Sequence, residues 1–296
     1  METQVIEEPL ESFLGRLPHK ILIEFARKYK KRFNLKIHSP REELISQILG
    51  KVPEKIILQD LYAPYGWAGN ITIHLFKIDG SKLNKISKKS QLDDVLKSFN
   101  FKRELTEEPK PVAITLSDNY IRIRHQFLGE PIVYQDPSTY KLQIVRPLKT
   151  AFTVIYLSDG FTELRIHERK YALKAIKLLV KNFGGNYESL RFKREHMAQW
   201  LEWASTLRNA RFKPIRPLST LYMAAQIGED LRKIQYFIEE WKKDTDLEGI
   251  YINFKYKNKK LGFGINAKVG KIMFKTFASE EEIKFIIDQG RKILGY

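Results

Sequence analysis

The chain opens with hydrophobic residues at helical spacing. Leu22, Phe25 and Tyr29 lie three or four positions apart and would line one face of a helix that starts at Pro18. A second helix is expected from Ser39-Pro40-Arg41-Glu42, where Ser39 would cap it, to Gly50. A third is expected over residues 53–61, before Tyr-Ala-Pro-Tyr-Gly breaks the pattern. Residues 1–66 are therefore predicted to form a small helical module.

Residues 67–110 mix two patterns. Positions 71–78 alternate between apolar and polar, which predicts a strand, and Asp79-Gly80 follows as a turn signal. Residues 90–99 have the pattern of a helix, and residues 104–111, polar and with two prolines, are typical of a linker. This part of the chain is predicted to be a connecting region with one strand and one helix.

From Val112 the hydrophobic period changes to two. The strand patterns cover 112–116, 120–127, 141–145, 152–157 and 161–166. An amphipathic helix is expected over 168–183, where Gly184-Gly185 stops it. Strands followed by a helix packed across them predict an α+β domain over 111–186.

The last third of the chain returns to helical spacing and then to strands. Helices are expected over 195–207, 218–227 and 229–241, so 187–243 is predicted to be a helical segment. Strands over 250–254, 261–265 and 271–277 precede a helix capped by Ser279, with Glu282 at the capping-box position. Residues 244–296 are thus a predicted β-β-β-α unit. The predicted fold class is α+β: a small N-terminal helical module followed by two antiparallel sheet-plus-helix domains.

Composition limits the cellular location we expect for the protein and the kinds of chemical site it can contain. No apolar run approaches the roughly 18 residues that a membrane-spanning helix needs, so no membrane partner is expected. The N-terminal METQVIEEPLES carries four glutamates before any basic residue, unlike a targeting segment. We expect a soluble intracellular protein, either cytoplasmic and nucleoid-associated or nuclear. With no cysteine, disulfides and thiolate metal sites are excluded.

The net charge of +17 indicates a polyanionic partner. The chain is lysine-rich, as thermophilic proteins often are. Its excess charge is concentrated in four segments, which hold ten basic against five acidic residues (17–60), five against two (119–149), seven against two (191–216) and seven against none (251–277). The candidate nucleic-acid contacts in these segments are Lys28, Lys30, Lys31, Arg32, Arg122, Arg124, Arg208, Arg211, Lys213, Arg216, Lys255, Lys257, Lys259 and Lys260.

Two strands are predicted to carry cations on one face. Arg122 and Arg124 are two positions apart, which places both opposite Ile121 and Ile123. The same spacing holds for Lys255 and Lys257, with two aromatic residues between and before them. Such a face binds phosphate backbones, although solvated strands also need polar residues. The aromatic residues of 251–263 are expected in the core rather than stacked on bases.

The stretch from Leu17 to Leu49 resembles the helix-extended-helix modules typified by SAP domains. Its second half, Arg41-Glu42-Glu43-Leu44-Ile45-Ser46-Gln47-Ile48-Leu49, matches their pattern K/R-x-E-L-I-x-x-L in part, while the turn before it lacks their usual glycine. The resemblance implies duplex DNA contacts from Lys36, Ser39 and Arg41. The order of a helical domain followed by sheet-and-helix units is also similar to the inner-kinetochore CENP-N family, which implies centromeric chromatin and a sister subunit as partners.

No enzyme motif stands out, and no catalytic residue, metal ligand or cofactor is predicted. The six histidines have no metal-ligand spacing, and neither a P-loop nor a nucleophile elbow occurs. A Mg-dependent nuclease remains an alternative if Asp118, Glu130, Asp136 and Asp159 converge. Another is a scaffold subunit that docks an acidic protein. The favoured function is non-catalytic binding of nucleic acid, DNA before RNA, which requires the four basic segments to meet on one surface.

Overall fold

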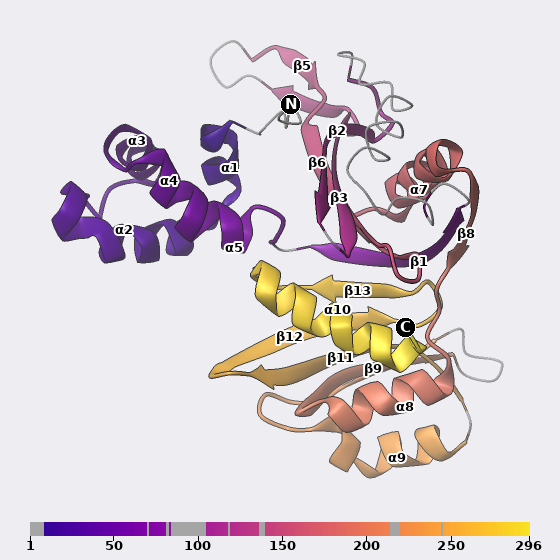
Figure 1. Ribbon diagram of the computed structural model, residues 1–296. Coiled ribbons are helices and arrows are strands. Elements are labelled where there is room, and N and C mark those ends of the chain that lie inside the picture. The colour runs from indigo at the N-terminus through magenta and orange to yellow at the C-terminus, as the bar shows by residue number, and fades with distance from the viewer. Residues whose placement is uncertain are drawn as a thin grey trace.

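The computed structural model describes residues 9–69, 71–80, 83, 105–117, 119–135, 140–213, 220–243 and 245–296 (Figure 1). Its helices are α1 (Leu10–Arg16), α2 (His19–Phe33), α3 (Arg41–Lys51), α4 (Glu54–Ile57), the π-helical turn η1 (Leu58–Tyr62), α5 (Ala63–Tyr65), α7 (Arg169–Phe183), α8 (Arg194–Trp203), the 3-10 turn η3 (Leu231–Lys233), α9 (Gln235–Lys242) and α10 (Glu280–Leu294). Among these residues no helix is both long enough and apolar enough to cross a bilayer.

The strands of the main sheet are β1 (Thr72–Gly80), β2 (Lys110–Ser117), β3 (Tyr120–Leu128), β6 (Leu148–Tyr156), β7 (Phe161–Arg165), β8 (Gly185–Ser189), β9 (Thr206–Lys213), β10 (Leu221–Ala224), β11 (Asp246–Tyr256), β12 (Lys259–Asn266) and β13 (Lys271–Phe274). They pair in the order β10-β9-β11-β12-β13-β1-β7-β6-β3-β2, with β8 on β1, and these pairs are antiparallel. A separate hairpin consists of β4 (Ile132–Gln135) and β5 (Leu142–Val145).

The α+β class is confirmed, and the strands of both predicted sheet units belong to one continuous sheet. Strand β1 joins them, because it pairs with β7 of the middle unit and with β13 of the C-terminal unit. Helix α7 packs on one face of the middle unit, whereas α8, α9 and α10 lie on the other side of the sheet, over the C-terminal strands (Figure 1). Each half therefore has its own hydrophobic core on an opposite face of the sheet.

The N-terminal module has a third core, to which α1, α2 and α3 contribute Phe13, Leu22, Phe25, Leu44 and Ile48. The predicted helices over its first fifty residues are confirmed. The predicted break at Tyr62-Ala-Pro-Tyr-Gly is wrong: helical structure continues through η1 and α5. Pro64 lies in the first turn of α5, where its missing N–H costs no hydrogen bond.

The predicted cap of α3 is also wrong. Ser39 is buried and its hydroxyl accepts a hydrogen bond from the Gln47 side chain at 3.0 Å, so it does not cap the helix. The residue before the helix is Pro40, which has no side chain that can cap. The capping box at the start of α10 is confirmed, because Ser279 accepts from the Glu282 N–H and the Glu282 carboxylate accepts from the Ser279 N–H.

The segment predicted to be helical over 187–243 holds three strands that the pattern did not show. Only α8, η3 and α9 are helical among its described residues, and β10 lies inside the predicted helix 218–227. In β9 the buried Leu207, Ala210 and Phe212 are not evenly spaced by two, because a bulge interrupts its pairing with β11. The alternation of apolar and polar residues therefore does not reveal β9 in the sequence.

Two further predictions concern the connecting region. Asp79-Gly80 is not a turn, because β1 runs through Gly80 to pair with Gly185 of β8. A side chain at position 80 would come within 2.9 Å of the Gly184 carbonyl oxygen, which explains the glycine. The predicted helix over 90–99 lies outside the described residues.

Candidate nucleic-acid interface

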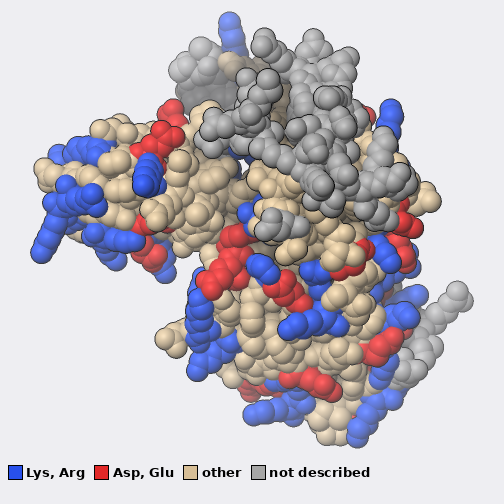
Figure 2. Space-filling model, in the orientation of Figure 1, with Lys and Arg blue, Asp and Glu red and all other residues tan. Residues whose placement is uncertain are grey.

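The cations of α2 form an exposed group at the end of that helix. Lys30, Lys31 and Arg32 occupy its last turn, and no described carboxylate lies within ion-pair distance of them. Lys28 differs, since it pairs with Asp60. Figure 2 shows Lys and Arg gathered over this module and again at the tip of the β11–β12 hairpin. Cations in the last turn also stabilise the helix through its dipole, so their position alone does not require a ligand.

The three residues implied by the SAP resemblance have different surroundings. Lys36 is exposed. Ser39 is buried against Gln47, as described above. Arg41 donates to the Leu17 carbonyl at 3.1 Å and to that of Gly15, which fixes α3 against the end of α1. Of the three, Lys36 has the freest side chain for a contact.

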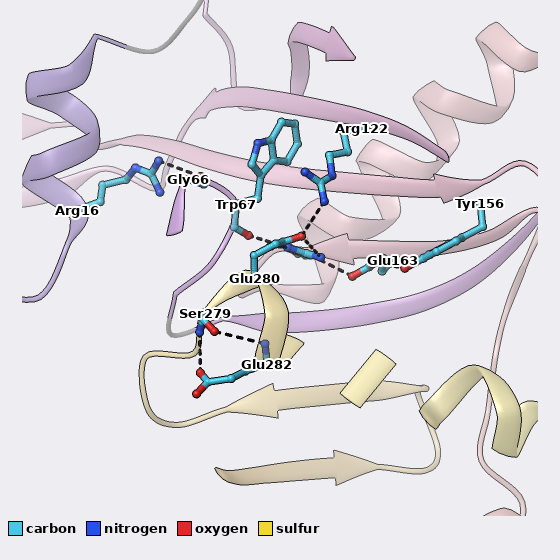
Figure 3. A network of polar contacts seen from close by, with 10 residues as sticks. Arg16, Gly66, Trp67, Arg122, Tyr156, Glu163, Ser279, Glu280 and Glu282 are labelled. Atoms are coloured by element: carbon cyan, nitrogen blue, oxygen red, sulfur yellow. Dashed lines mark hydrogen bonds and ion pairs between the residues drawn. The ribbon is translucent and has the colours of Figure 1, made fainter. Parts of the chain in front are cut away.

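The predicted solvent-facing pair on β3 is wrong. Arg122 and Arg124 do lie opposite Ile121 and Ile123, but Arg124 is only 3% exposed and Arg122 is half-buried against Glu280 of α10. Glu280 accepts from Arg122 at 3.1 Å (Figure 3) and from the buried Arg165 at 3.1 Å. Arg122 and Arg165 therefore hold the start of α10 against the strands of the middle unit, where the two halves of the sheet meet.

Buried charged residues lie where the two halves of the sheet meet. Arg165 donates to Glu163 at 3.0 Å and to the Trp67 carbonyl at 2.8 Å, and the Tyr156 hydroxyl donates to Glu163 at 3.0 Å (Figure 3). Burial opposes the charge of Arg165, but the two glutamates outweigh it and raise the arginine's pKa. Burial likewise opposes the charge of Glu280, and Arg165 outweighs it and lowers the pKa of that carboxyl. Burial, together with the charge of Glu163, raises the pKa of Tyr156.

The arginines of β9 also have internal partners. Arg208 donates to the carbonyls of Gln226 at 2.7 Å and Glu229 at 3.0 Å and so holds the loop after β10. Arg211 is exposed and lies 3.3 Å from a Glu248 oxygen. Lys213 is exposed, and Arg216 lies outside the described residues.

The four lysines of the β11–β12 hairpin divide into two pairs. Lys257 and Lys259 form ion pairs of 2.7 Å with Glu281 and Glu282 at the start of α10. Lys255 and Lys260 are exposed, and no described carboxylate lies within ion-pair distance of either. The register places Lys255 directly opposite Lys260, so their side chains project from the same face.

That face is the one turned away from the helices. On its opposite side, Phe254 stacks on Trp203 of α8 at 3.9 Å and contacts Phe285 of α10. Side chains at the alternate positions of β11 therefore point the other way, where no described helix covers them. We call this the cationic sheet face. It is formed by Asn209, Arg211, Tyr222, Tyr251, Asn253, Lys255, Lys260 and Lys275.

At its centre β12 contributes two glycines, and the side chains of Tyr251 and Asn253 lie over the first of them. Gly262 and Gly264 lie opposite Asn253 and Tyr251, and a Cβ at position 262 would be 2.5 Å from the Tyr251 hydroxyl. Lys275 lies over the Tyr251 ring at 4.6 Å. Sequence reasoning missed Asn209 and Tyr222 because β9 and β10 were not recognised as strands. It also did not single out Asn253 and Lys275, although both lie in segments predicted to be strands. The core position of Phe254 and Phe263 is confirmed, whereas Tyr251, also expected in the core, lies on the cationic sheet face.

The four basic segments do not form one surface. Arg122 and Arg124 project from the face of the sheet that α10 covers, whereas Lys255, Lys260 and Arg211 project from the other. The α2 cations lie on the separate module (Figure 1). The segments 191–216 and 251–277 do meet, because β9 pairs with β11 and β11 with β12.

The carboxylates considered for a nuclease are apart where they are described. Glu130 pairs with Lys170, and Asp159 pairs with Arg291 and accepts from the Phe161 N–H within its own turn. Asp118 and Asp136 lie outside the described residues. Within the described ranges, no three histidines or carboxylates are grouped in a way that could hold a metal.

Neither a protein-family model nor a curated protein sequence matches this chain.

Proposed function

We propose that this chain is a non-catalytic nucleic-acid-binding protein, with DNA as the favoured partner, and that its cationic sheet face holds the phosphate backbone. The observation that carries the proposal is the opposed pair Lys255 and Lys260. Like charges directly opposite each other on two strands destabilise a sheet, and here no described carboxylate offsets them. A phosphate between the two ammonium groups would offset that repulsion.

The neighbours of this pair suit the same ligand. Arg211 and Lys275 extend the positive charge along the face. Contacts of this kind carry little sequence information, so binding should depend weakly on base sequence.

The N-terminal module supports the proposal as a second contact. Its exposed Lys30, Lys31, Arg32 and Lys36 lie in and after α2, next to the turn that the SAP resemblance assigns to duplex DNA. Because the module is separate from the sheet face, the two surfaces would contact different stretches of one nucleic acid.

The test compares two double variants of one hairpin. Lys255→Gln with Lys260→Gln should weaken DNA binding at least about tenfold at low salt, and should reduce the slope of log K against log salt by about two, since two phosphate contacts are lost. Lys257→Gln with Lys259→Gln removes the same net charge from residues paired with α10, and should change affinity less than about twofold. Fluorescence anisotropy with duplex DNA, single-stranded DNA and RNA measures both quantities.

Two results would contradict the proposal: equal weakening in both variants, or an affinity that does not change with salt. The first would mean that only overall charge matters. The second would remove the phosphate contacts on which the proposal depends. The rival function, a scaffold that docks an acidic protein, predicts instead that the chain retains a single stoichiometric protein partner when heparin and mixed DNA are added. Tighter binding of RNA than of DNA would support the same binding surface and contradict DNA as the favoured partner.

A further inference from the structure

Two tyrosine rings of the cationic sheet face lie outside the hydrophobic core. Tyr222 of β10 is 60% exposed, and Tyr251 of β11 is half-buried. On the opposite face of β11, Phe254 and Tyr256 pack on Phe285 of α10. Within the described part of the chain, no other aromatic ring lies against Tyr222 or Tyr251. Both rings are therefore without an aromatic partner there.

Tyr251 lies on the surface of the sheet. A Cβ at Gly262 would be 3.2 Å from its Cζ, and a Cβ at Gly264 would be 3.7 Å from its Cδ2, so the ring extends over both glycines of β12. The ammonium group of Lys275 lies 4.6 Å from the ring centroid. Because lysine has a flexible stem, this cation can move from the ring to a phosphate.

Tyr222 lies on the outermost described strand at this end of the sheet. The register places it directly opposite Arg211, and it places Asn209 opposite Tyr251. The Asn209 amide donates to the Tyr222 hydroxyl, which positions one end of an exposed ring. Since β9 separates β10 from β11, the two rings are two strands apart, about 10 Å across the sheet. Each ring can thus hold a different base of one strand.

Aromatic rings among cations on an open sheet suit a particular form of nucleic acid. Unpaired bases stack on such rings while cations hold the backbone. In a duplex the bases are already stacked on each other, and only their edges are open in the grooves. Rings on the protein therefore gain contacts with a single strand that a duplex does not offer.

We infer that the cationic sheet face holds a single strand, with Tyr222 and Tyr251 stacked on unpaired bases. The inference rests on the proposed function, because Lys255 and Lys260 must hold the backbone on this face. The helical module is a separate surface and remains the contact proposed for duplex DNA.

The test compares a single-stranded oligonucleotide with a duplex of the same length, by fluorescence anisotropy at one salt concentration. Tyr222→Leu should weaken binding of the single strand more than about fivefold and of the duplex less than about twofold. Tyr251→Leu should show the same selectivity. Tyr222→Phe keeps the ring and should bind the single strand within about twofold of the unaltered chain.

The matched control is Tyr236→Leu. Tyr236 is 54% exposed, but it lies on α9, which covers the opposite face of the sheet, so its loss should change neither affinity. Tyr222 and Tyr236 are both exposed, so neither leucine variant should unfold the protein, and circular dichroism can verify this.

Equal weakening of single strand and duplex by Tyr222→Leu would overturn the inference. So would an unchanged single-strand affinity in that variant while Lys255→Gln with Lys260→Gln reduces it, and the phosphate contacts would then stand without stacking. If the double lysine variant binds as the unaltered chain does, the proposed function fails and this inference fails with it.

Discussion

At the scale of single residues, cations of the same type end in three environments. Arg124 and Arg165 are buried, Lys257 and Lys259 pair with α10, and Lys255 remains exposed without a described carboxylate nearby. Spacing along the strand correctly predicts that Arg122 and Arg124 share a face. The same prediction for Lys255 and Lys257 is wrong, because β11 ends at Tyr256 and Lys257 lies in the turn with a φ of 51°, from where it reaches Glu281 of α10. Spacing cannot predict the environment, because the partner comes from an element far away in the sequence.

Histidines show a similar division. His125 is fully buried with its ring nitrogen 2.8 Å from the Thr153 hydroxyl, and burial lowers its pKa to about 4. His74 is buried as well, and burial, with Lys271 and Arg169 nearby, also lowers its pKa to about 4. Both rings are neutral in the folded protein at pH 7.

This predicts acid destabilisation in a defined window. The unfolded chain protonates these histidines near pH 6.5 and the folded chain only near pH 4, so their contribution is present above pH 6.5 and is lost as the pH falls toward 4. Between pH 7.5 and 5, each should remove about 2 kcal/mol from the free energy of unfolding. Urea denaturation at both pH values should show a correspondingly smaller loss for His125→Asn.

The control is His38→Asn, at an exposed position of the helical module. It should lose stability with pH as the unaltered chain does. Identical pH dependence for His125→Asn and the unaltered chain would show that His125 does not titrate in this window.

At the scale of elements, short sequence patterns predicted the structure correctly where the interacting residues are neighbours in the chain. The capping box of α10 and the glycine that ends α7 are determined within a few residues, and both were predicted. The predicted cap at Ser39 is wrong because Gln47 donates a hydrogen bond to the Ser39 hydroxyl. Strand β9 was not predicted because a bulge disturbs its alternation of apolar and polar residues.

Removing the hydroxyl that caps α10 should cost stability, whereas removing an exposed hydroxyl inside a helix should not. Ser279→Ala should reduce the free energy of unfolding by about 1 kcal/mol, because it leaves an N–H of α10 without its acceptor. Ser46→Ala, at an exposed position inside α3, should be neutral or slightly stabilising through helix propensity. Thermal or urea unfolding measures both, and equal effects would contradict the assigned cap.

At the scale of the whole molecule, one sheet and one buried ion network join the two halves. Glu280 of α10 binds Arg165 of β7 and Arg122 of β3, residues 115 and 158 positions away in the sequence. Because β1 pairs with strands of both halves, neither half can lose its strands without exposing the edge of the other.

Breaking this network should affect both halves together. Arg165→Met leaves Glu163 and Glu280 without their shared partner and should cost about 3–5 kcal/mol. Tryptophan fluorescence, which reports chiefly on Trp200, Trp203 and Trp241 near the C-terminal core, and far-UV circular dichroism should still give coincident transitions. Lys170→Met, which removes an exposed ion pair, should change neither measurement. Two separate transitions would show that the halves unfold independently.

The α+β class, most helices of the N-terminal module, the β11–β12–β13 strands with α10, and the excess of positive charge could all be predicted from the sequence. These follow from periodicity, turns and caps, which act over a few residues. Three features became known only from the folded chain: the strands form one sheet, Arg122 and Arg124 are internal, and Lys255 and Lys260 are the exposed pair. The physical reason is that strand order and ion pairing join residues far apart in the chain, such as Thr72 with Met273 or Arg122 with Glu280, and no local pattern encodes such partners.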